Sequence, residues 1–434
     1  MKDDLRMNKH VVYLKGERTV ILWNRMTGGC AAITPRQFNA LNDASANKKI
    51  ISTKKIQRLK TASILIDNTE NELKSLTERS KKFTTDAANC RKLRCLELSV
   101  SEHCNYQCVY CTFWRNKSAS KKKYMSTEVA EKALRDFIDI TYEQKEIVIY
   151  FGTAEPLMNW EVIVHISQLA KKLRPDVSLN LITNGSLMTE ERLRFCKKTK
   201  IKVGISFDGL PDRQNRQRIP SSKDINSSET VLELLKLGSR INFKFSCLSA
   251  TYSQADFKAD IEYLVGICQK YDIQEFDLDF DINHLGKVNT EILKDELLFG
   301  YQKIKDAGLN IFGYWLIPFL NIINGGNDIK SFCGNVAGES VCISSEGNFK
   351  LCGYENTSTH KYTSLKKHLL SKKFKVICES HLPNKNQLCI NCIVEGVCGG
   401  QCMLTDTASQ SWKNACDFYQ KITKALLINY FSNK

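Results

Sequence analysis

Between Leu96 and about Gly308 the chain alternates short β-rich apolar runs with longer segments in which apolar residues recur at helical spacing. This alternation is typical of successive βα units. We expect six parallel strands with right-handed crossovers, forming a full or partial barrel whose chemistry lies at the carboxyl ends of the strands. The expected strands are LELSV (96–100), IVIYFG (147–152), LNLIT (179–183), KVGISF (202–207), NFKFSCL (242–248) and FDLDFDI (276–282).

The pattern changes on both sides of this α/β region. Residues 9–67 contain β-rich runs (VVYLKG, TVILWN) followed by two helical runs, and a lysine-rich, weakly patterned stretch from about 68 to 92 is typical of a linker. From Cys333 the chain is dense in cysteine, with glycine turns. We therefore predict an N-terminal α+β element (1–70), a linker (71–92), a (βα)6 partial barrel (93–310) and a cysteine-rich extension (311–434).

Neither the apolar runs nor the charge of the chain points to a membrane or to nucleic acid. The first ten residues, MKDDLRMNKH, carry charges where a signal peptide needs an apolar stretch, and the longest apolar run, Tyr314 to Ile323, is about half of a bilayer span. The net charge is +16, yet Lys and Arg are spread along the chain, which favours a solvated basic surface. We predict a cytoplasmic protein with no membrane partner and without nucleic acid as a partner.

The chain has 18 cysteines and no export signal. A reducing cytosol keeps thiols from pairing, so metal binding is the first explanation for such a surplus. Directly after the first expected strand, SEHCNYQCVYC places Cys104, Cys108 and Cys111 in a C-x3-C-x2-C spacing. Three thiolates hold three irons of a 4Fe-4S cube and leave one iron open, whereas a closed zinc site needs a fourth ligand that this segment does not offer.

This triplet, in this place, resembles the motif of the radical S-adenosylmethionine (SAM) superfamily, in which the open iron chelates SAM. Tyr110 matches the aromatic residue beside the adenine, and FGTAEPL (151–157) is similar to the family's GGEP segment, with Thr153 and Ala154 in place of glycines. Ser206-Phe207-Asp208-Gly209 resembles the ribose-contacting S-x-D-G. The resemblance implies SAM contacts from Tyr110, Gly152, Thr153, Ala154, Glu155, Asn184, Ser206 and Asp208.

A second field of cysteines near the C-terminus resembles the SPASM domain of peptide-modifying radical SAM enzymes, which carries two auxiliary 4Fe-4S clusters. Its pattern, C-x(9–15)-G-x4-C, C-x2-C-x5-C-x3-C and a final C, is fully met. The resemblance implies a first auxiliary set of Cys333, Cys352 and Cys402, and a second set of Cys389, Cys392, Cys398 and Cys416.

Cys342 is left open between two interpretations. If the turn in ISSEGNFKLC is a three-residue loop centred on Gly347, Cys342 faces Cys352 across a hairpin and becomes a further ligand. A register slipped by one residue turns it to the other face, as an ordinary buried cysteine. The remaining cysteines match no ligand spacing: Cys30, Cys90, Cys95, Cys196, Cys247, Cys268 and Cys378.

Together these resemblances imply a radical SAM peptide maturase with three 4Fe-4S clusters and SAM. It would abstract hydrogen from a ribosomally made precursor and form a thioether or carbon–carbon crosslink, with an electron donor such as flavodoxin or ferredoxin. The N-terminal element is similar to the winged-helix unit that binds leader peptides in many maturases; a domain that only packs on the barrel is the alternative.

Three other functions remain open. A sulfatase-maturing enzyme shares the clusters, but an Asp follows its equivalent of Cys352, where this chain has Gly353. An RNA-modifying radical SAM enzyme would use the positive charge, and a non-catalytic iron–sulfur protein would not cleave SAM. The sequence names no catalytic acid or base.

Overall fold

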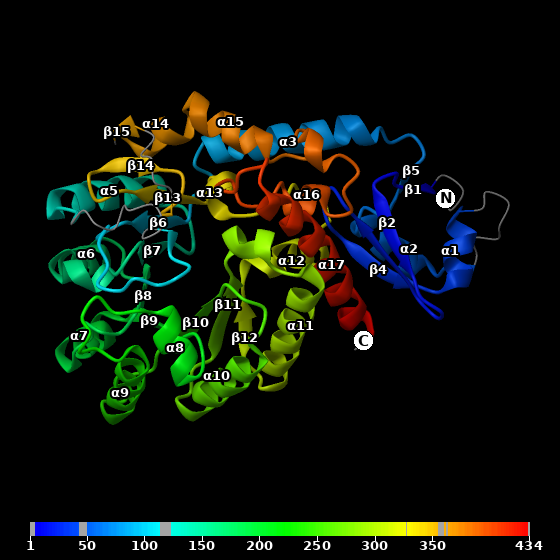
Figure 1. The fold of residues 1–434 in the computed structure, drawn as a ribbon. Coiled ribbons are helices and arrows are strands. Elements are labelled where there is room, and N and C mark those ends of the chain that lie inside the picture. The colour runs from blue at the N-terminus through cyan, green and yellow to red at the C-terminus, as the bar shows by residue number, and fades with distance from the viewer. Residues whose placement is uncertain are drawn as a thin grey trace.

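The computed structural model describes residues 5–42, 50–112, 123–326, 328–354, 360–361 and 363–432. A curved sheet flanked by helices forms one half of the molecule, and the N-terminal element lies at the opposite end, with the C-terminal segments packed along both (Figure 1). Among the described helices, none is both long and apolar enough to cross a lipid bilayer.

The barrel sheet is built from parallel strands, as predicted. Each pairing from β12 through β11, β10, β9, β8, β7 and β6 to β13 is parallel, and β14 and β15 continue the sheet in antiparallel fashion. The strands are β6 (Cys95–Leu98), β7 (Val148–Phe151), β8 (Ser178–Thr183), β9 (Ile201–Ser206), β10 (Cys247–Tyr252), β11 (Glu275–Phe280), β12 (Asn310–Phe312), β13 (Ser340–Ile343), β14 (Asn348–Lys350) and β15 (His360–Lys361). The helices are α5 (Thr127–Ile140), α6 (Trp160–Leu173), α7 (Glu190–Thr199), α8 (Pro211–Gln217), α9 (Ser227–Arg240), α10 (Lys258–Lys270) and α11 (Thr290–Asp306).

One predicted strand is misplaced. NFKFSCL (242–248) was expected to be extended, but β10 begins only at Cys247. The two phenylalanines of the run belong to the connection from α9: Phe243 and Phe245 are buried against each other with ring centroids 5.1 Å apart, and Phe245 packs over Gly238 of the helix. The apolar run therefore packs against the C-terminal end of α9, and the strand itself is the more polar CLSATY.

The N-terminal element has the predicted order of strands followed by two helices. Its sheet runs β2–β3–β4, and a separate pair joins β1 to β5. All five residues of β3 are buried because one face packs under the element's own helices through Val20 and Leu22, while Ile21 and Trp23 join the main core of the protein. The elements are β1 (Leu5–Met7), β2 (Val11–Lys15), β3 (Val20–Asn24), β4 (Cys30–Ile33), α1 (Pro35–Asn42), α2 (Thr53–Thr61) and β5 (Leu65–Asp67).

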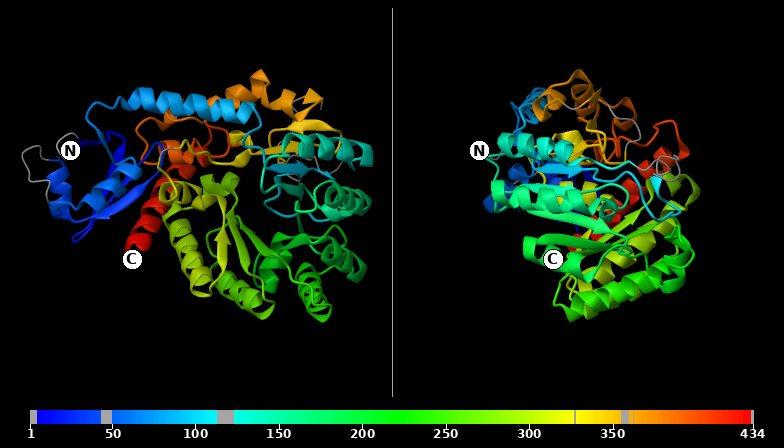
Figure 2. Two further views of the ribbon diagram at one scale, coloured as in Figure 1. Left: turned by 180° about the vertical axis from the view of Figure 1, so that it is seen from behind. Right: turned by 90° about the vertical axis from the view of Figure 1, so that its left-hand side faces the viewer.

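The segment predicted as a linker is mostly helical, which corrects that interpretation. Helix α3 (Glu72–Ala88) is capped by Asn71 and contacts α15, as can be followed in Figure 1 and in the left view of Figure 2. Its apolar stripe is narrow, with Leu76, Phe83 and Ala87 buried between charged residues, so the sequence pattern is weak. The domain boundaries stay predictions, since one hydrophobic core runs from β3 through the barrel to the last helix.

The C-terminal extension wraps back along the barrel and the N-terminal element. β13 lies beside β6, and the last helix contacts α11. The Nε1 of Trp23 donates to the carbonyl of Ile393 (2.8 Å), and the N–H of Gly396 donates to the carbonyl of Arg25 (2.9 Å), so the N-terminal element docks on this extension. Its helices are α12 (Ile317–Ile323), α13 (Gly334–Ala337), α14 (Leu365–Leu369), α15 (Lys372–Ser380), α16 (Glu395–Cys398) and α17 (Gln410–Ser432).

Candidate functional site

The loop that follows β6 brings the three cysteines of the first motif together. The N–H of Cys111 donates to the carbonyl of Cys108 (3.0 Å), and the N–H of Tyr106 donates to Cys104 Sγ (3.4 Å). Burial raises the pKa of Cys108 to about 12, and the neighbouring Cys111 acts in the same direction. The three thiols act on one another within a single loop, and metal binding would remove their protons, so they are candidates to hold one cluster together.

The segment after β7 holds a strained turn beside this loop. Thr153 and Ala154 have φ of 67° and 36°, in the left-handed region where glycine is at home and a β-branched residue is an outlier. Thr153 Oγ1 lies 2.7 Å from Ser99 Oγ. The two side chains that replace the family's glycines are thus accommodated at a conformational cost, and strain of this kind concentrates at functional sites.

Glu155 is buried, and its carboxylate binds polar groups at the end of β8. Its carboxylate accepts the Thr183 hydroxyl (2.8 Å) and the N–H groups of Asn184 (2.9 Å) and Leu157 (3.1 Å). Burial raises its pKa from 4.5 to about 6, and these hydrogen bonds oppose the rise. The side chain predicted to contact SAM therefore ties together two of the predicted SAM-binding segments.

This buried carboxyl predicts a pH effect on stability. Because the folded-state pKa is the higher one, the stability that Glu155 contributes is fully present below pH 4.5 and is lost as the pH rises through 6. We expect the free energy of unfolding of wild type, relative to Glu155→Gln, to fall by about 2 kcal/mol across this window. Denaturant titrations at a series of pH values measure it, and a constant difference between the two proteins would refute the assignment.

Two further predicted contacts lie at neighbouring strand ends. The Asn184 amide Nδ2 donates to Asn105 Oδ1 (3.0 Å) and lies 4.0 Å from Cys104 Sγ, so the residues after β8 adjoin the cysteine loop. Ser206 ends β9 and is paired in register with Ser249 of β10. The strand ends therefore bring these predicted residues to one edge of the barrel, as expected for parallel strands.

Asp208, predicted to contact the ribose, is completely buried and hydrogen-bonded to protein donors. Both of its oxygens accept the Arg218 guanidinium at 2.9 Å, and the Tyr110 hydroxyl donates to Oδ2 (2.8 Å). The N–H of Thr251 and the Gln217 amide complete the set (3.0 and 3.2 Å). In this structure Asp208 is a junction that joins the end of β9 to the cysteine loop.

The C-terminal cysteines gather in two groups. Cys333 and Cys402 both act on the pKa of Cys352, which burial raises to about 12. Cys392 acts with Cys389 and Cys416 on the buried Cys398 in the same way. Backbone N–H groups donate to sulfurs in both groups, which is an environment that favours thiolate ligands. The groups correspond to the two predicted auxiliary sets.

The second group lines one small hollow. The Gln401 amide Nε2 lies within hydrogen-bond distance of Cys416 Sγ (2.9 Å) at its wall. In the described parts of the chain, no three His, Cys, Asp or Glu side chains converge closely enough to hold a single metal ion. The hollow is lined by Cys389, Cys392, Val394, Glu395, Cys398, Gly400, Gln401, Cys416 and Tyr419.

The hairpin argument for Cys342 is wrong. The loop is three residues long, but it comprises 345–347, with Gly347 in its last position at φ 74°. This register pairs Cys342 with Lys350 and not with Cys352. The Cys342 thiol is fully buried, 3.5 Å from Ser99 Oγ, and Cys352 is near enough to act on its pKa, so its role as a ligand stays a prediction.

Three carboxylates on the inner face of the barrel were not predicted. Glu97 alternates with the core residues Leu96 and Leu98 on β6, and Asp277 and Asp279 alternate in the same way on β11. Burial, reinforced by the charge of Asp277, raises the pKa of Asp279 well above its usual range. The signal was present in LEL and in FDLDFD, where single acidic residues interrupt strands that are otherwise apolar.

Glu97 also explains Gly353. A Cβ at position 353 would lie 2.0 Å from Glu97 Oε1 and 2.9 Å from Thr153 Oγ1, so the carboxylate occupies the space that a side chain after Cys352 would need. Thr153 Oγ1 donates to the same oxygen (3.3 Å). Glu97 thus lies between the segment after β7 and the first auxiliary group.

Gly353→Asp is therefore expected to destabilise the protein. The new side chain overpacks the site and sets a second carboxylate against Glu97, at a cost of about 1–3 kcal/mol. Adding Glu97→Gly should restore at least half of that loss. Denaturant titrations of the four proteins measure the coupling, and a Gly353→Asp protein as stable as wild type would contradict it.

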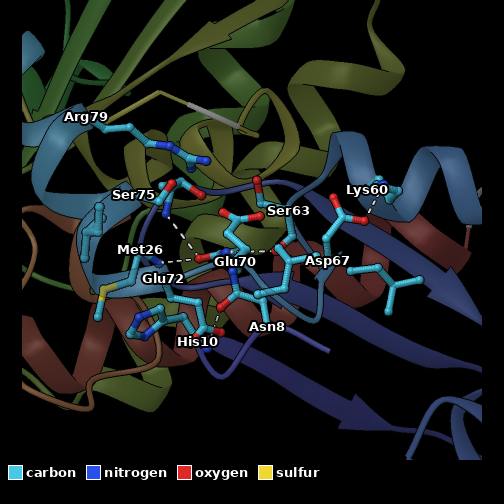
Figure 3. A pocket seen from close by; sticks show the side chains of 15 residues that line it. Asn8, His10, Met26, Lys60, Ser63, Asp67, Glu70, Glu72, Ser75 and Arg79 are labelled. Atoms are coloured by element: carbon cyan, nitrogen blue, oxygen red, sulfur yellow. Dashed lines mark hydrogen bonds and ion pairs between the residues drawn. The ribbon is translucent and has the colours of Figure 1, made fainter. Parts of the chain in front are cut away.

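A separate hollow lies between the N-terminal element and helix α3. Asn8, His10, Glu70, Glu72 and Arg79 surround it (Figure 3). Both ring nitrogens of the buried His10 have no hydrogen-bond partner among the described residues, and burial lowers its pKa to about 4. None of the predicted cluster or SAM residues lines this hollow.

Comparison with known proteins gives a family and several relatives. Residues 98–258 match the radical SAM superfamily. The chain is 26% identical to the radical SAM cyclopropyl synthase TigE of Paramaledivibacter caminithermalis, over 84% of this chain and 80% of the relative. It is 21% identical to a cysteine-type anaerobic sulfatase-maturating enzyme of Clostridium novyi, over 72% of this chain and 88% of the relative.

Solved structures share the fold. Native anSMEcpe with bound AdoMet superimposes with a TM-score of 0.59 at 17% identity, covering 79% of this chain and 99% of that chain. Streptococcus suis SuiB bound to S-adenosylmethionine gives a TM-score of 0.52 at 16% identity, covering 92% and 95%. The second alignment covers more of this chain, and both confirm the α/β radical SAM architecture.

Proposed function

Since residues 98–258 belong to the radical SAM superfamily, whose members are enzymes that bind SAM and a 4Fe-4S cluster, we propose that this chain is a peptide maturase. It would reductively cleave SAM, abstract a hydrogen atom from a ribosomally made precursor and form a carbon–carbon or thioether crosslink. The observation that carries the proposal is the meeting of the Cys104, Cys108 and Cys111 loop with the ends of β7, β8 and β9 at one edge of the barrel.

A 4Fe-4S cluster held by Cys104, Cys108 and Cys111 would supply the radical chemistry at this edge, because it would bind SAM and deliver the electron for its cleavage. Hydrogen bonds within the chain position the cysteine loop and Tyr110. Tyr106 donates its N–H to Cys104 Sγ, and Asn184 binds Asn105 in the same loop. Asp208 fixes the hydroxyl of Tyr110, the aromatic residue expected beside the adenine.

The proposal includes two auxiliary clusters, on Cys333, Cys352 and Cys402 and on Cys389, Cys392, Cys398 and Cys416. The grouping of the thiols and the N–H donors around them support it. The second set closes its own hollow with four thiols, which matches the four ligands of a closed cluster. The first set has three thiols and so leaves room for one more ligand.

A peptide substrate is supported by the relatives. One solved structure of anSMEcpe contains AdoMet and a peptide, and the sulfatase-maturating enzymes act, by name, on another protein. The relative named as a cyclopropyl synthase makes a carbon ring, which favours a carbon–carbon bond over a thioether for this chain. A leader segment would bind the N-terminal element, whose outer strands β2 and β4 flank β3.

Each of the three alternative functions can be separated from peptide maturation by a specific observation. Formylglycine formation is disfavoured because Glu97 fills the space of the Asp that follows the equivalent of Cys352 in sulfatase-maturing enzymes. RNA modification would require RNA binding that weakens steeply with salt. A non-catalytic iron–sulfur protein would leave SAM intact.

The test is co-production of the chain with short peptides encoded beside its gene, under anaerobic conditions, followed by mass spectrometry of the peptides. A crosslink removes the mass of two hydrogen atoms from one peptide, and only when the Cys104, Cys108 and Cys111 motif is intact. One would leave as the hydrogen atom taken by the 5′-deoxyadenosyl radical, and the other as a proton to solvent and an electron to an auxiliary cluster. Modification of RNA in place of any peptide would reject the proposal. An electron donor such as flavodoxin or ferredoxin is part of the reaction, because each cleavage consumes one electron.

A further inference from the structure

A second segment of the chain clamps the cysteine loop. The residues that follow α8 run antiparallel to it: the N–H of Gln107 donates to the carbonyl of Ile219 (2.6 Å), and the N–H of Val109 donates to that of Gln217 (2.9 Å). The N–H of Ser221 returns a bond to the carbonyl of Asn105 (2.8 Å). The positions of Cys104 and Cys108 are therefore tied to residues 217–221.

Arg218 lies at the centre of this clamp. Its guanidinium is buried and binds Asp208 through two parallel bonds, Nε to Oδ2 and the terminal nitrogen to Oδ1, both 2.9 Å. Its cationic carbon stands 5.5 Å from the centre of the Tyr110 ring, and the Tyr110 hydroxyl donates to the same carboxylate. Strand β9, the clamp and the cysteine loop thus meet in one buried junction.

The charge of Arg218 also reaches the cysteines. Its guanidinium faces the ring of Tyr110, which directly precedes Cys111, and the carbonyl of the neighbouring Gln217 accepts the N–H of Val109, which directly follows Cys108. A buried cation acts strongly here because little water screens it. The same charge would favour the reduced, more negative state of a cluster bound at Cys108.

We propose that Arg218 is a positioning residue that holds Tyr110 and the Cys108 turn in the SAM-binding pose and raises the reduction potential of the cluster bound there. Asp208 anchors Arg218 in this arrangement instead of binding the ribose. The inference rests on the proposed SAM chemistry. No sequence motif marked Arg218, because it lies ten residues beyond Asp208 at the end of a short helix.

The chain offers a matched control on α8, the helix that ends directly before Arg218. Arg213 is as buried as Arg218 and also pairs with a buried carboxylate, with Nε 3.1 Å from Asp260 Oδ2. Its other partner is Asp256, 3.0 Å away, at the start of α10. Arg213 therefore stabilises the fold through an equivalent ion pair whose partners are not in the cysteine loop.

The experiment compares Arg218→Met, Arg218→Lys, Tyr110→Phe and Arg213→Met in the anaerobically reconstituted full chain. An EPR-monitored redox titration follows the reduced-cluster signal that changes when SAM is added, and equilibrium binding gives the Kd for SAM. Iron content and the thermal midpoint are recorded for each protein.

We expect Arg218→Met to lower the potential of the SAM-responsive cluster and to weaken SAM binding at least about tenfold, the equivalent of one lost charged hydrogen bond. Arg218→Lys should keep the potential but not the affinity, because lysine lacks the two-pronged geometry. Tyr110→Phe should weaken SAM binding without changing the potential. Arg213→Met should lower the thermal midpoint and leave both readouts as in wild type.

Equal effects of Arg218→Met and Arg213→Met on potential and affinity would overturn the inference. If Arg218→Met does not fold, Arg218→Met with Asp208→Asn removes both buried charges, which proteins often tolerate. Because the two charges oppose each other, this variant tests the SAM affinity alone, which should again fall at least about tenfold. A wild-type protein whose EPR signal does not respond to SAM would reject the proposed function, and the inference with it. A wild-type response with unchanged Arg218 variants rejects the inference alone.

Discussion

Replacing Cys104, Cys108 and Cys111 together with alanine is expected to abolish formation of 5′-deoxyadenosine and to lower the iron content from about twelve to about eight per chain. The loop carries all three sulfurs of one set, and the other cysteines gather elsewhere in the fold, so two clusters should survive. Iron and sulfide analysis after anaerobic reconstitution, with chromatography of the nucleoside product, measures both effects.

The control for this variant is Cys196→Ala with Cys268→Ala. Both cysteines are fully buried and are interpreted as core residues, so their loss should affect stability and leave iron content and SAM cleavage unchanged. Loss of all twelve irons from the triplet variant would contradict the independence of the sets. Retention of twelve would show that the triplet holds no cluster.

Cys389→Ala with Cys392→Ala is expected to have the second large effect, because the loop from Cys389 to Cys398 carries the docking of the N-terminal element. Trp23 donates to the carbonyl of Ile393, and the N–H of Gly396 donates to the carbonyl of Arg25. In addition, the Arg25 guanidinium donates to Asn391 Oδ1 (2.9 Å). A Cβ at Gly396 would lie 2.1 Å from the Met26 carbonyl oxygen, so the contact is close-fitting. Without its cluster this loop loses the cross-links that order it.

We therefore expect the Cys389, Cys392 variant to lose about four irons and to show faster hydrogen–deuterium exchange over residues 20–33, with the barrel strands still protected. Cys378→Ala is the matched control, since this buried cysteine of the same extension should leave iron and exchange unchanged. Loss of iron with unchanged exchange in β3 would mean that docking does not depend on the second auxiliary set.

The barrel could be predicted because parallel strands buried by helices leave a strong record in the sequence. Five of the six expected strands are confirmed to within about two residues at each end. The sixth, NFKFSCL, was misplaced because buried phenylalanines in a connection have the same composition as a strand. Helix α3 was overlooked because only a narrow stripe of it is buried.

Site residues could be predicted where the ligands are close together in the sequence. They could not be predicted where strand register or contacts between distant segments determine which residues belong to the site. Cysteine spacing marked both motifs. The residue opposite Cys342 in its hairpin depended on whether Gly347 is the central or the last residue of the loop, a difference of one position that sequence spacing does not resolve. Glu97 and Arg218 have no motif of their own, and their importance follows from neighbours that are far away in the chain.

The most direct test of radical SAM chemistry is to mix the reconstituted, reduced wild-type protein with SAM and to measure 5′-deoxyadenosine and methionine by mass spectrometry. We expect both products in equal amounts, from a protein that contains iron and sulfide. Intact SAM, or zinc in place of iron, would contradict this expectation and leave a metal-stabilised binding protein.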